Sequence, residues 1–293
     1  MLVMMGTTGQ VGGAALEALK QRGIAVRAIA RDAGRARHLA GPGIEIVRGE
    51  ATDTASLVAA FQGAEAAFVM LVPPMQAADV LAESRAAVQS IASAIRTAGV
   101  PHVVALSSAG AHLAEGNGIV QTLHDFEQGL AGVAPSLTFL RPGDFMENWA
   151  AMLPAAREAG VLPSAKLPLD AAGETVSAVD VGRTVAELLL DPRPGMRIIN
   201  LMGPKEYSPA DAAAALSDLL GKPVMAVPSS RDETIAALQA AGASADFAAK
   251  LADLTDAVNA GRMDVGAGDG ETRRGTITLQ EALRLLTREN ARD

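Results

Sequence analysis

A short apolar run passes directly into a glycine-rich turn in the segment LVMMGTTGQVGG (residues 2–13). The apolar run predicts a buried strand, and the Ala- and Leu-rich stretch after the glycines predicts a helix over 10–22. Gly6, Gly9 and Gly12 give the spacing GxxGxxG. A helix N-terminus offers free N–H groups and the positive end of its dipole, and glycines allow an anion to approach the backbone. Between a strand and a helix, this motif predicts a dinucleotide site rather than a purely structural turn.

The alternation of strand and helix continues through the first half of the chain. Apolar runs that predict strands lie at 2–5, 24–30, 44–47, 66–71, 102–106 and 137–140. Amphipathic stretches that predict helices lie at 10–22, 33–39, 55–61, 75–97 and 120–130. Repeated units of this kind form a parallel sheet with helices on both faces. The predicted fold class is therefore α/β, with a doubly wound parallel sheet.

The pattern changes after Pro142. The later segments predict a helix at 145–159, a Pro- and Gly-spaced stretch at 161–173, a helix at 180–190, a strand at 197–201, and Ala-rich helices at 210–220, 232–241 and 245–259. We expect a dinucleotide-binding domain and a small, mainly helical substrate lobe. The first would span 1–150, completed by about 178–203, and the second would span 151–177 and 204–293.

Composition excludes several classes of protein. With 293 residues and 49% hydrophobic content the chain can bury a large core, and 3% aromatic content argues against an aromatic-rich β-sandwich. A net charge of -8 gives no electrostatic footprint for direct nucleic-acid binding. The absence of Cys excludes disulfides and thiolate metal sites, and no His and carboxylate cluster has metal-ligand spacing. No signal peptide and no membrane span are predicted, so we expect a cytoplasmic protein. Its oligomeric state is left open between a monomer and a homodimer.

The end of the second predicted strand bears on the choice of cofactor. It reads Arg31-Asp32, about twenty residues beyond the last motif glycine, where the adenosine ribose of a bound dinucleotide lies. Arg31, with Arg35 nearby, suits the 2′-phosphate of NADP, whereas a carboxylate suits the free 2′-OH of NAD. Asp32 has the alternative role of a helix cap, and the arginines that of a solvated helix face. The sequence favours NADP(H) and leaves NAD(H) possible.

The remaining cofactor contacts are expected where the parallel strands end, because ligands of open α/β sheets bind at the carboxyl ends of the strands. The predicted cofactor-binding residues are Gly6, Thr8, Gly9, Gln10, Val11, Gly12, Arg31, Arg35, Glu50, Leu71, Val72, Pro73 and Ser107. The hydroxyls of Ser107 and Ser108 suit a ribose or a substrate oxygen, but serine is also common in turns. Pro74, next in line, is predicted to contact the substrate.

Several segments together resemble the NmrA-like branch of the atypical short-chain dehydrogenases/reductases. They read GTTGQVG (6–12), VRAIARD (26–32), LRPGDFMEN (140–148) and DAVNAGR (256–262). The resemblance implies a Rossmann domain that binds NADP(H) and a small C-terminal substrate lobe. The family includes NADPH-dependent quinone reductases and azoreductases, and also proteins that bind the dinucleotide without turning it over and act as redox sensors. Fold alone does not choose between them.

The chain departs from the wider superfamily at the helix after the fifth strand. That superfamily has a Tyr-x-x-x-Lys pair there, whereas GIVQTLHDFE (118–127) contains neither residue, and the single tyrosine is Tyr207. Without a phenol to protonate an alkoxide, reduction of simple ketones is disfavoured. Quinones and other conjugated acceptors delocalise the charge formed on hydride addition. The sequence therefore favours an NADPH-dependent oxidoreductase with such a small-molecule acceptor, with a non-catalytic redox sensor as the alternative.

No catalytic residue stands out. His112 and His124 could supply a proton near neutral pH, but such histidines more often have a surface or capping role. Ser108 could contact a substrate oxygen, but serine at a strand end is also ordinary in turns. Phe145 and Trp149 could form an apolar wall for a planar substrate, or could pack between the lobes.

Overall fold

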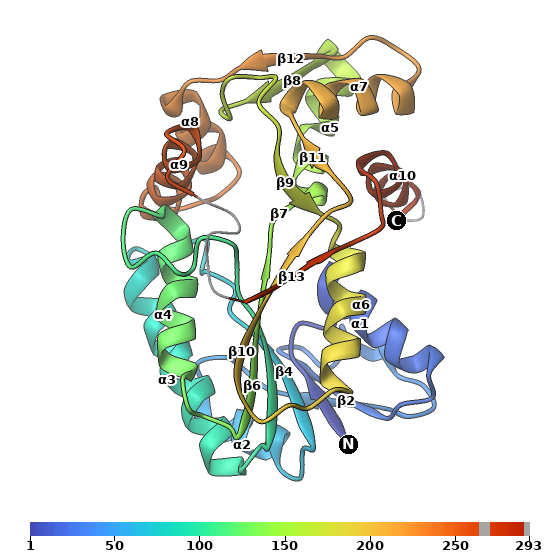
Figure 1. Cartoon of the computed structure of the whole chain (residues 1–293), viewed down its shortest axis with the longest axis vertical. Helices are drawn as coiled ribbons and strands as arrows, with labels where there is room; N and C mark the ends of the chain where they lie inside the picture. The colour runs from blue at the N-terminus through green and yellow to red at the C-terminus, as the bar shows by residue number, and fades with distance from the viewer. Residues whose placement is uncertain (264–269, 290–293) are drawn as a thin grey trace.

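Within residues 1–263 and 270–289, which the computed structural model describes, the core strands form an eight-stranded sheet (Figure 1). In spatial order the strands are β13 (Glu271–Arg274), β10 (Gly195–Met202), β6 (Ser136–Pro142), β5 (His102–Leu106), β4 (Ala66–Met70), β1 (Leu2–Met4), β2 (Val26–Ala30) and β3 (Ile44–Arg48). Every neighbouring pair in this sheet is parallel. Parallel strands need crossover connections, which place helices on both faces. The predicted doubly wound α/β fold is confirmed.

Helices cover both faces of the sheet (Figure 1). One layer contains α1 (Gln10–Gln21) and α6 (Ala178–Leu189), and the other contains α2 (Thr54–Phe61), α3 (Val80–Ala98) and α4 (Gln121–Leu130). Successive side chains of β1 point to opposite faces of the sheet. Leu2 and Met4 pack in the hydrophobic cluster under α1 and α6, and Val3 packs in the cluster under α2, α3 and α4. No helix in the described ranges is long and apolar enough to span a membrane.

All six strands predicted in the first half are present, with ends that differ by no more than two residues. The helix predicted over 33–39 is wrong, since only a 3-10 turn, η1 (Arg37–Leu39), forms there. Asp32 Oδ1 accepts from the N–H groups of Gly34 (2.8 Å) and Arg35 (3.1 Å), as in a helix N-cap, but the turn that follows does not propagate. Gly34 disfavours a helix in the first turn and Gly41-Pro42 ends the segment, which leaves it too short for more than a 3-10 turn.

The helix predicted over 145–159 is also interrupted. The segment divides into β7 (Asp144–Phe145), the 3-10 helix η3 (Met146–Met152) and α5 (Leu153–Ala159). Asp144 and Phe145 are held extended because they pair with β9 (Gly173–Val176), a contact between segments far apart in sequence. Only the last part of the stretch is a regular α-helix.

A further hydrophobic cluster lies beyond the carboxyl ends of β6 and β10 (Figure 1). Besides η3 and α5, its elements are β8 (Val161–Ser164), β11 (Glu206–Tyr207), α7 (Pro209–Leu220), β12 (Met225–Pro228) and α10 (Leu279–Glu289). The sequence did not predict α10 or β13. β13 reads ETRR and lies at the sheet edge, so it lacks the apolar run that marks a buried strand.

A helical hairpin, α8 (Arg231–Ala240) and α9 (Ala245–Asn259), packs against the sheet domain rather than against that cluster (Figure 1). Phe247, Leu251 and Leu254 contact a small cluster that includes Val80 and Ile119. The hairpin therefore lies next to the segments that follow β4 and β5.

Candidate functional site

The turn between β1 and α1 is built from close backbone contacts. Gly6 has a φ of +69°, which favours glycine, and the Gly9 N–H donates to the Gly6 carbonyl at 3.0 Å. A Cβ on Gly12 would lie 2.1 Å from the same Gly6 oxygen. No side chain caps the start of α1, and its first turn has no acidic residue. The free N–H groups and the helix dipole therefore suit an anion such as a pyrophosphate.

The other side chains of this turn differ in their surroundings. Thr8 and Gln10 are exposed, whereas Val11 is buried in the core, so only its backbone can face a ligand. Thr7 is 1% exposed, and its Oγ1 has no hydrogen-bond partner within the described residues. A buried hydroxyl without a partner at this turn fits a site completed by a ligand.

The end of β2 provides cationic side chains. Arg31 and Arg35 are exposed, and neither forms an ion pair with any described part of the chain. Asp32, by contrast, uses its Oδ1 in the turn described above. The two guanidinium groups are thus free to bind a phosphate.

The next strand ends line the same edge of the sheet. Glu50 after β3 is exposed; after β4, Leu71 is buried, Val72 is 69% exposed, and Pro73 and Pro74 are half-buried. An exposed valine followed by prolines offers an apolar surface without backbone donors at the prolines. These residues lie at the carboxyl ends of parallel strands, where a dinucleotide binds in this fold.

Ser107, after β5, belongs to a buried polar network. Its hydroxyl donates to Glu127 Oε1 at 2.5 Å, and Arg141 binds both oxygens of Glu127 at 2.8 and 2.5 Å. The side chains of Arg141 and Glu127 are 5% and 6% exposed. The Ser107 proton is therefore committed to Glu127, although its oxygen can still accept a hydrogen bond.

Two of the catalytic candidates, Ser108 and His112, lie in the connection from β5 to α4, and the third, His124, lies in α4. The Ser108 hydroxyl donates to the Ala109 carbonyl (2.9 Å), and His124 Nδ1 is 2.9 Å from the Ala111 carbonyl, where it can only donate. His112 is half-buried. With one ring nitrogen bonded to the backbone, His124 also stabilises this connection, so its geometry fits a structural role at least as well as a catalytic one.

Phe145 and Trp149 lie where the chain leaves the sheet. Phe145 is half-buried, and Trp149 is 7% exposed within the cluster beyond β6, with no hydrogen-bond partner for its Nε1 among the described residues. Trp149 thus packs mainly inside that cluster, and Phe145 is the more accessible of the two.

The hairpin α8–α9 contributes contacts that no local pattern predicts. Asp246 Oδ2 accepts from the Val80 N–H (2.8 Å), and the Ser244 N–H donates to the Met75 carbonyl (2.9 Å). Met263 lies so close to Gly110 that a Cβ there would be 2.1 Å from its Cε. The hairpin is therefore fixed to the segments after both β4 and β5.

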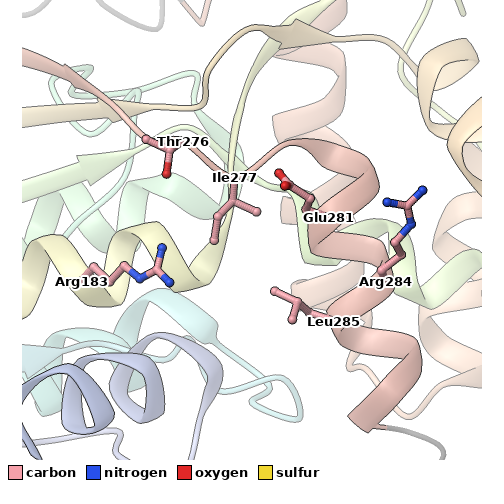
Figure 2. Close-up of a pocket in the computed structure, with 6 residues that line it drawn as sticks. All are labelled: Arg183, Thr276, Ile277, Glu281, Arg284 and Leu285. Carbon is pink, nitrogen blue, oxygen red and sulfur yellow. The ribbon is translucent and has the colours of Figure 1, made fainter. Parts of the chain in front are cut away.

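A pocket of about 410 Å³ lies elsewhere, between α6 and α10 (Figure 2). Its lining residues are Arg183, Thr276, Ile277, Glu281, Arg284 and Leu285. None of the predicted site residues is among them. Within residues 1–263 and 270–289, no group of His and carboxylate side chains could hold a metal ion.

Comparisons with known proteins identify the family of this chain. The family model described as the NmrA-like family matches residues 1–245. An NAD(P)H azoreductase of Xenophilus azovorans is 29% identical over 87% of this chain and 86% of its own length. Quinone oxidoreductase 2 of Escherichia coli is 28% identical over 92% and 89%. The solved structure of an NADPH-dependent quinone oxidoreductase of E. coli with NADPH covers 98% of this chain and 100% of that one, with 25% identity and a TM-score of 0.76.

Proposed function

Because this chain belongs to the NmrA-like family and is an NAD(P)H-dependent oxidoreductase, we propose that it passes hydride to a quinone or a similarly conjugated acceptor. The observation that carries the proposal is the surface of α4. It has no tyrosine or lysine, Glu127 is held by Arg141, and His124 is bonded to the backbone. An acceptor that delocalises the charge from hydride addition needs no phenol on this helix.

The dinucleotide would bind across the carboxyl ends of the strands, with its pyrophosphate at the start of α1. Arg31 and Arg35 support a preference for NADP(H), because their guanidinium groups suit a 2′-phosphate while Asp32 is engaged in its turn. We assign the cofactor to the domain formed by 1–150 and 178–203, and the acceptor to the lobe of 151–177 and 204–293. β13 and the α8–α9 hairpin are exceptions to that division, since β13 joins the main sheet and the hairpin packs against the sheet domain.

In this scheme NADPH supplies the hydride, and the protein positions NADPH and the acceptor next to each other. Val72 and Pro74 offer an apolar surface on the β4 side, and Phe145 offers one where the chain leaves β6. Side chains of this kind hold a planar acceptor and exclude water.

The experiment that tests this function follows the loss of NADPH absorbance by purified protein with a panel of small quinones. The control contains no acceptor. Saturable oxidation that depends on the acceptor is the expected result. A folded sample that binds NADPH but oxidises none of it with any quinone would contradict the proposal.

The same sample then tests the alternative of a redox sensor. A sensor must bind NADPH and NADP⁺ with different affinity, because only differential binding shifts a conformational population. We expect turnover instead. Calorimetric titration with each form, together with the absorbance assay, separates the two functions.

A further inference from the structure

Lys166 lies in the connection from β8 to β9, and its side chain reaches the segment that follows β6. Its Nζ forms an ion pair with Asp144 Oδ2 and lies 5.5 Å from the centroid of the Trp149 ring. The Lys166 and Asp144 side chains are 36% and 35% exposed, so both remain accessible to solvent. This cation is therefore accessible just beyond the carboxyl end of β6, at the end of the sheet where ligands bind.

The backbone on both sides of Lys166 is held by side chains. Ser164 Oγ accepts from the Lys166 N–H at 3.1 Å. Asn259, at the end of α9, accepts from the Leu167 N–H (2.9 Å) and donates to the Ala165 carbonyl (2.8 Å). An exposed lysine on an ordinary loop has no such support. The hairpin that is fixed to the β4 and β5 segments thus also fixes the position of Lys166.

Asp144, the carboxylate that pairs with Lys166, is also held in place by its neighbours. Asp144 Oδ1 accepts from Asn148 Nδ2 at 2.7 Å, which leaves Oδ2 for Lys166. Its backbone pairs with Thr175 of β9, and a Cβ on Gly143 would lie 2.8 Å from the Glu174 carbonyl oxygen. Asp144 is therefore held in place and cannot follow a movement of Lys166. A small motion of the flexible lysine side chain can then move its ammonium group from this carboxylate to another oxyanion.

We propose that Lys166 is a catalytic residue, the cation that contacts the acceptor oxygen on which negative charge forms. The proposal rests on the proposed function and deepens it, since it fills the role left open by α4. The hydride carries two electrons from NADPH to the acceptor, which is reduced, and NADP⁺ forms. One acceptor oxygen becomes an anion, binds the ammonium group of Lys166 and takes a proton from it as an N–H bond breaks and an O–H bond forms. Lys166 regains a proton from water.

A phenolate mimics that oxyanion without turnover. We would titrate the protein with 4-nitrophenol in the presence of saturating NADP⁺, and follow the phenolate by its absorbance and the binding by fluorescence of Trp149, the single tryptophan. A cation next to the oxygen lowers the pKa of the bound phenol by about 1 or more below that of the free phenol. The expected wild-type result is this shift.

Four variants decide whether Lys166 causes the shift. Lys166→Met should weaken phenolate binding about tenfold and abolish the shift, while Lys166→Arg keeps most of both. Asp144→Asn should bind the phenolate at least as tightly as the wild type, because it releases the lysine. Lys205→Met is the matched control, since Lys205 is exposed and lies 4.9 Å from the centroid of the Tyr207 ring in the turn between β10 and β11. The Lys205→Met variant should bind the phenolate as the wild type does, with the same pKa shift.

A purely structural ion pair predicts a different pattern. Lys166→Met and Asp144→Asn would then weaken phenolate binding equally, and that result overturns the proposal. So does the absence of phenolate binding or of a shift in the wild type. Circular dichroism and NADPH affinity establish that each variant is folded.

Turnover provides a separate readout. With quinones, Lys166→Met should lower kcat about tenfold with the affinity for NADPH unchanged, and it should slow the acceptors of low reduction potential most, because their oxyanions are the most basic. An equal loss for all acceptors contradicts the proposal. If the wild type oxidises no NADPH with any quinone, the proposed function fails, and the phenolate titration still decides whether Lys166 binds an oxyanion.

Discussion

Two neighbouring glycines at the start of α1 differ in their tolerance for a side chain. A Cβ on Gly12 would meet backbone atoms of the turn, with Gly6 O at 2.1 Å and Thr7 N at 2.9 Å, whereas a Cβ on Gly13 would find Thr7 O at an ordinary 3.6 Å. We expect Gly12→Ala to distort the turn and to weaken NADPH binding at least about tenfold. Gly13→Ala should bind normally and gain up to about 1 kcal/mol of stability from its helix propensity. Fluorescence titration measures the NADPH affinity of both variants, and thermal melting measures their stability. Equal NADPH affinities would contradict the assignment of this turn as the pyrophosphate site.

The preference for NADP(H) is tested at Arg31. The Arg31→Ala variant should lose about tenfold or more of its affinity for NADPH and little of its affinity for NADH, because only NADPH has the 2′-phosphate. Arg22→Ala serves as a control, since Arg22 is exposed at the far end of α1. Affinities from fluorescence titration decide the matter. An equal loss for the two cofactors would show that Arg31 does not bind the phosphate.

At the scale of elements, the buried pair of Glu127 and Arg141 joins α4 to β6. Arg141→Met leaves the Glu127 charge buried without its partner, so we expect a loss of about 3–5 kcal/mol in the free energy of unfolding. The double variant Glu127→Gln/Arg141→Met should lose less, because it removes both charges and keeps an oxygen that can accept from Ser107. Urea unfolding measures these differences.

A second ion pair on α4 gives the control for that measurement. Arg85 of α3 donates to Asp125 at 2.6 Å, but its side chain is 55% exposed. Arg85→Met should cost no more than about 1 kcal/mol, since water and salt screen exposed pairs. If both arginine substitutions cost the same, burial does not govern the Arg141 pair.

At the scale of the whole molecule, Glu147 connects η3 to the start of α6. It accepts from Ser177 Oγ at 2.8 Å and from the Ala178 N–H at 3.0 Å. Asp180, in the first turn of α6, accepts in turn from the N–H groups of Thr276 (2.7 Å) and Ile277 (2.8 Å), just before α10. The sheet domain and the cluster beyond it are therefore joined through two carboxylates at one helix end.

Burial raises the pKa of the Glu147 carboxyl above its ordinary 4.5, against the opposing effect of its hydrogen bonds, and nearby Asp180 raises it further. The unfolded chain thus ionises first as pH rises, so the contribution of this group to stability is complete below pH 4.5 and decreases up to its folded pKa. Glu147→Gln keeps an accepting oxygen but cannot ionise. Its free energy of unfolding, relative to wild type, should therefore increase between about pH 4.5 and 7.

Urea unfolding across that pH range checks the prediction. Glu158→Gln, an exposed position on α5, should show no such trend. Glu147→Ala should be less stable at every pH by about 1–3 kcal/mol, because the buried Ala178 N–H loses its acceptor. A Glu147→Gln difference that stays constant with pH would mean that the carboxyl does not titrate differently in the folded state.

The sequence by itself determined the doubly wound fold class and the position of the glycine-rich turn between β1 and α1. The alternation of strands and helices and the GxxGxxG spacing are both local patterns, so they can be recognised in the sequence without knowledge of the tertiary contacts. The sequence left open whether Arg31 or Asp32 contacts the adenosine ribose of the cofactor, because a carboxylate at that position can cap a turn or bind a ribose. The hydrogen bonds of Asp32 to the turn favour the first role.

Only the tertiary structure brought together the polar groups around the proposed acceptor site. Lys166 meets Asp144 across 22 residues, and Asn259 holds Ala165 across 94. No periodicity or motif spacing encodes such pairs, because they depend on how β9 aligns with β7 and on where the hairpin packs. The helix predicted at 145–159 failed for a related reason, because strand pairing with a distant segment holds Phe145 extended. The helix predicted at 33–39 failed for a local reason, because the capped segment is too short to propagate beyond a 3-10 turn. Local patterns set the framework, and contacts between distant segments set the chemistry.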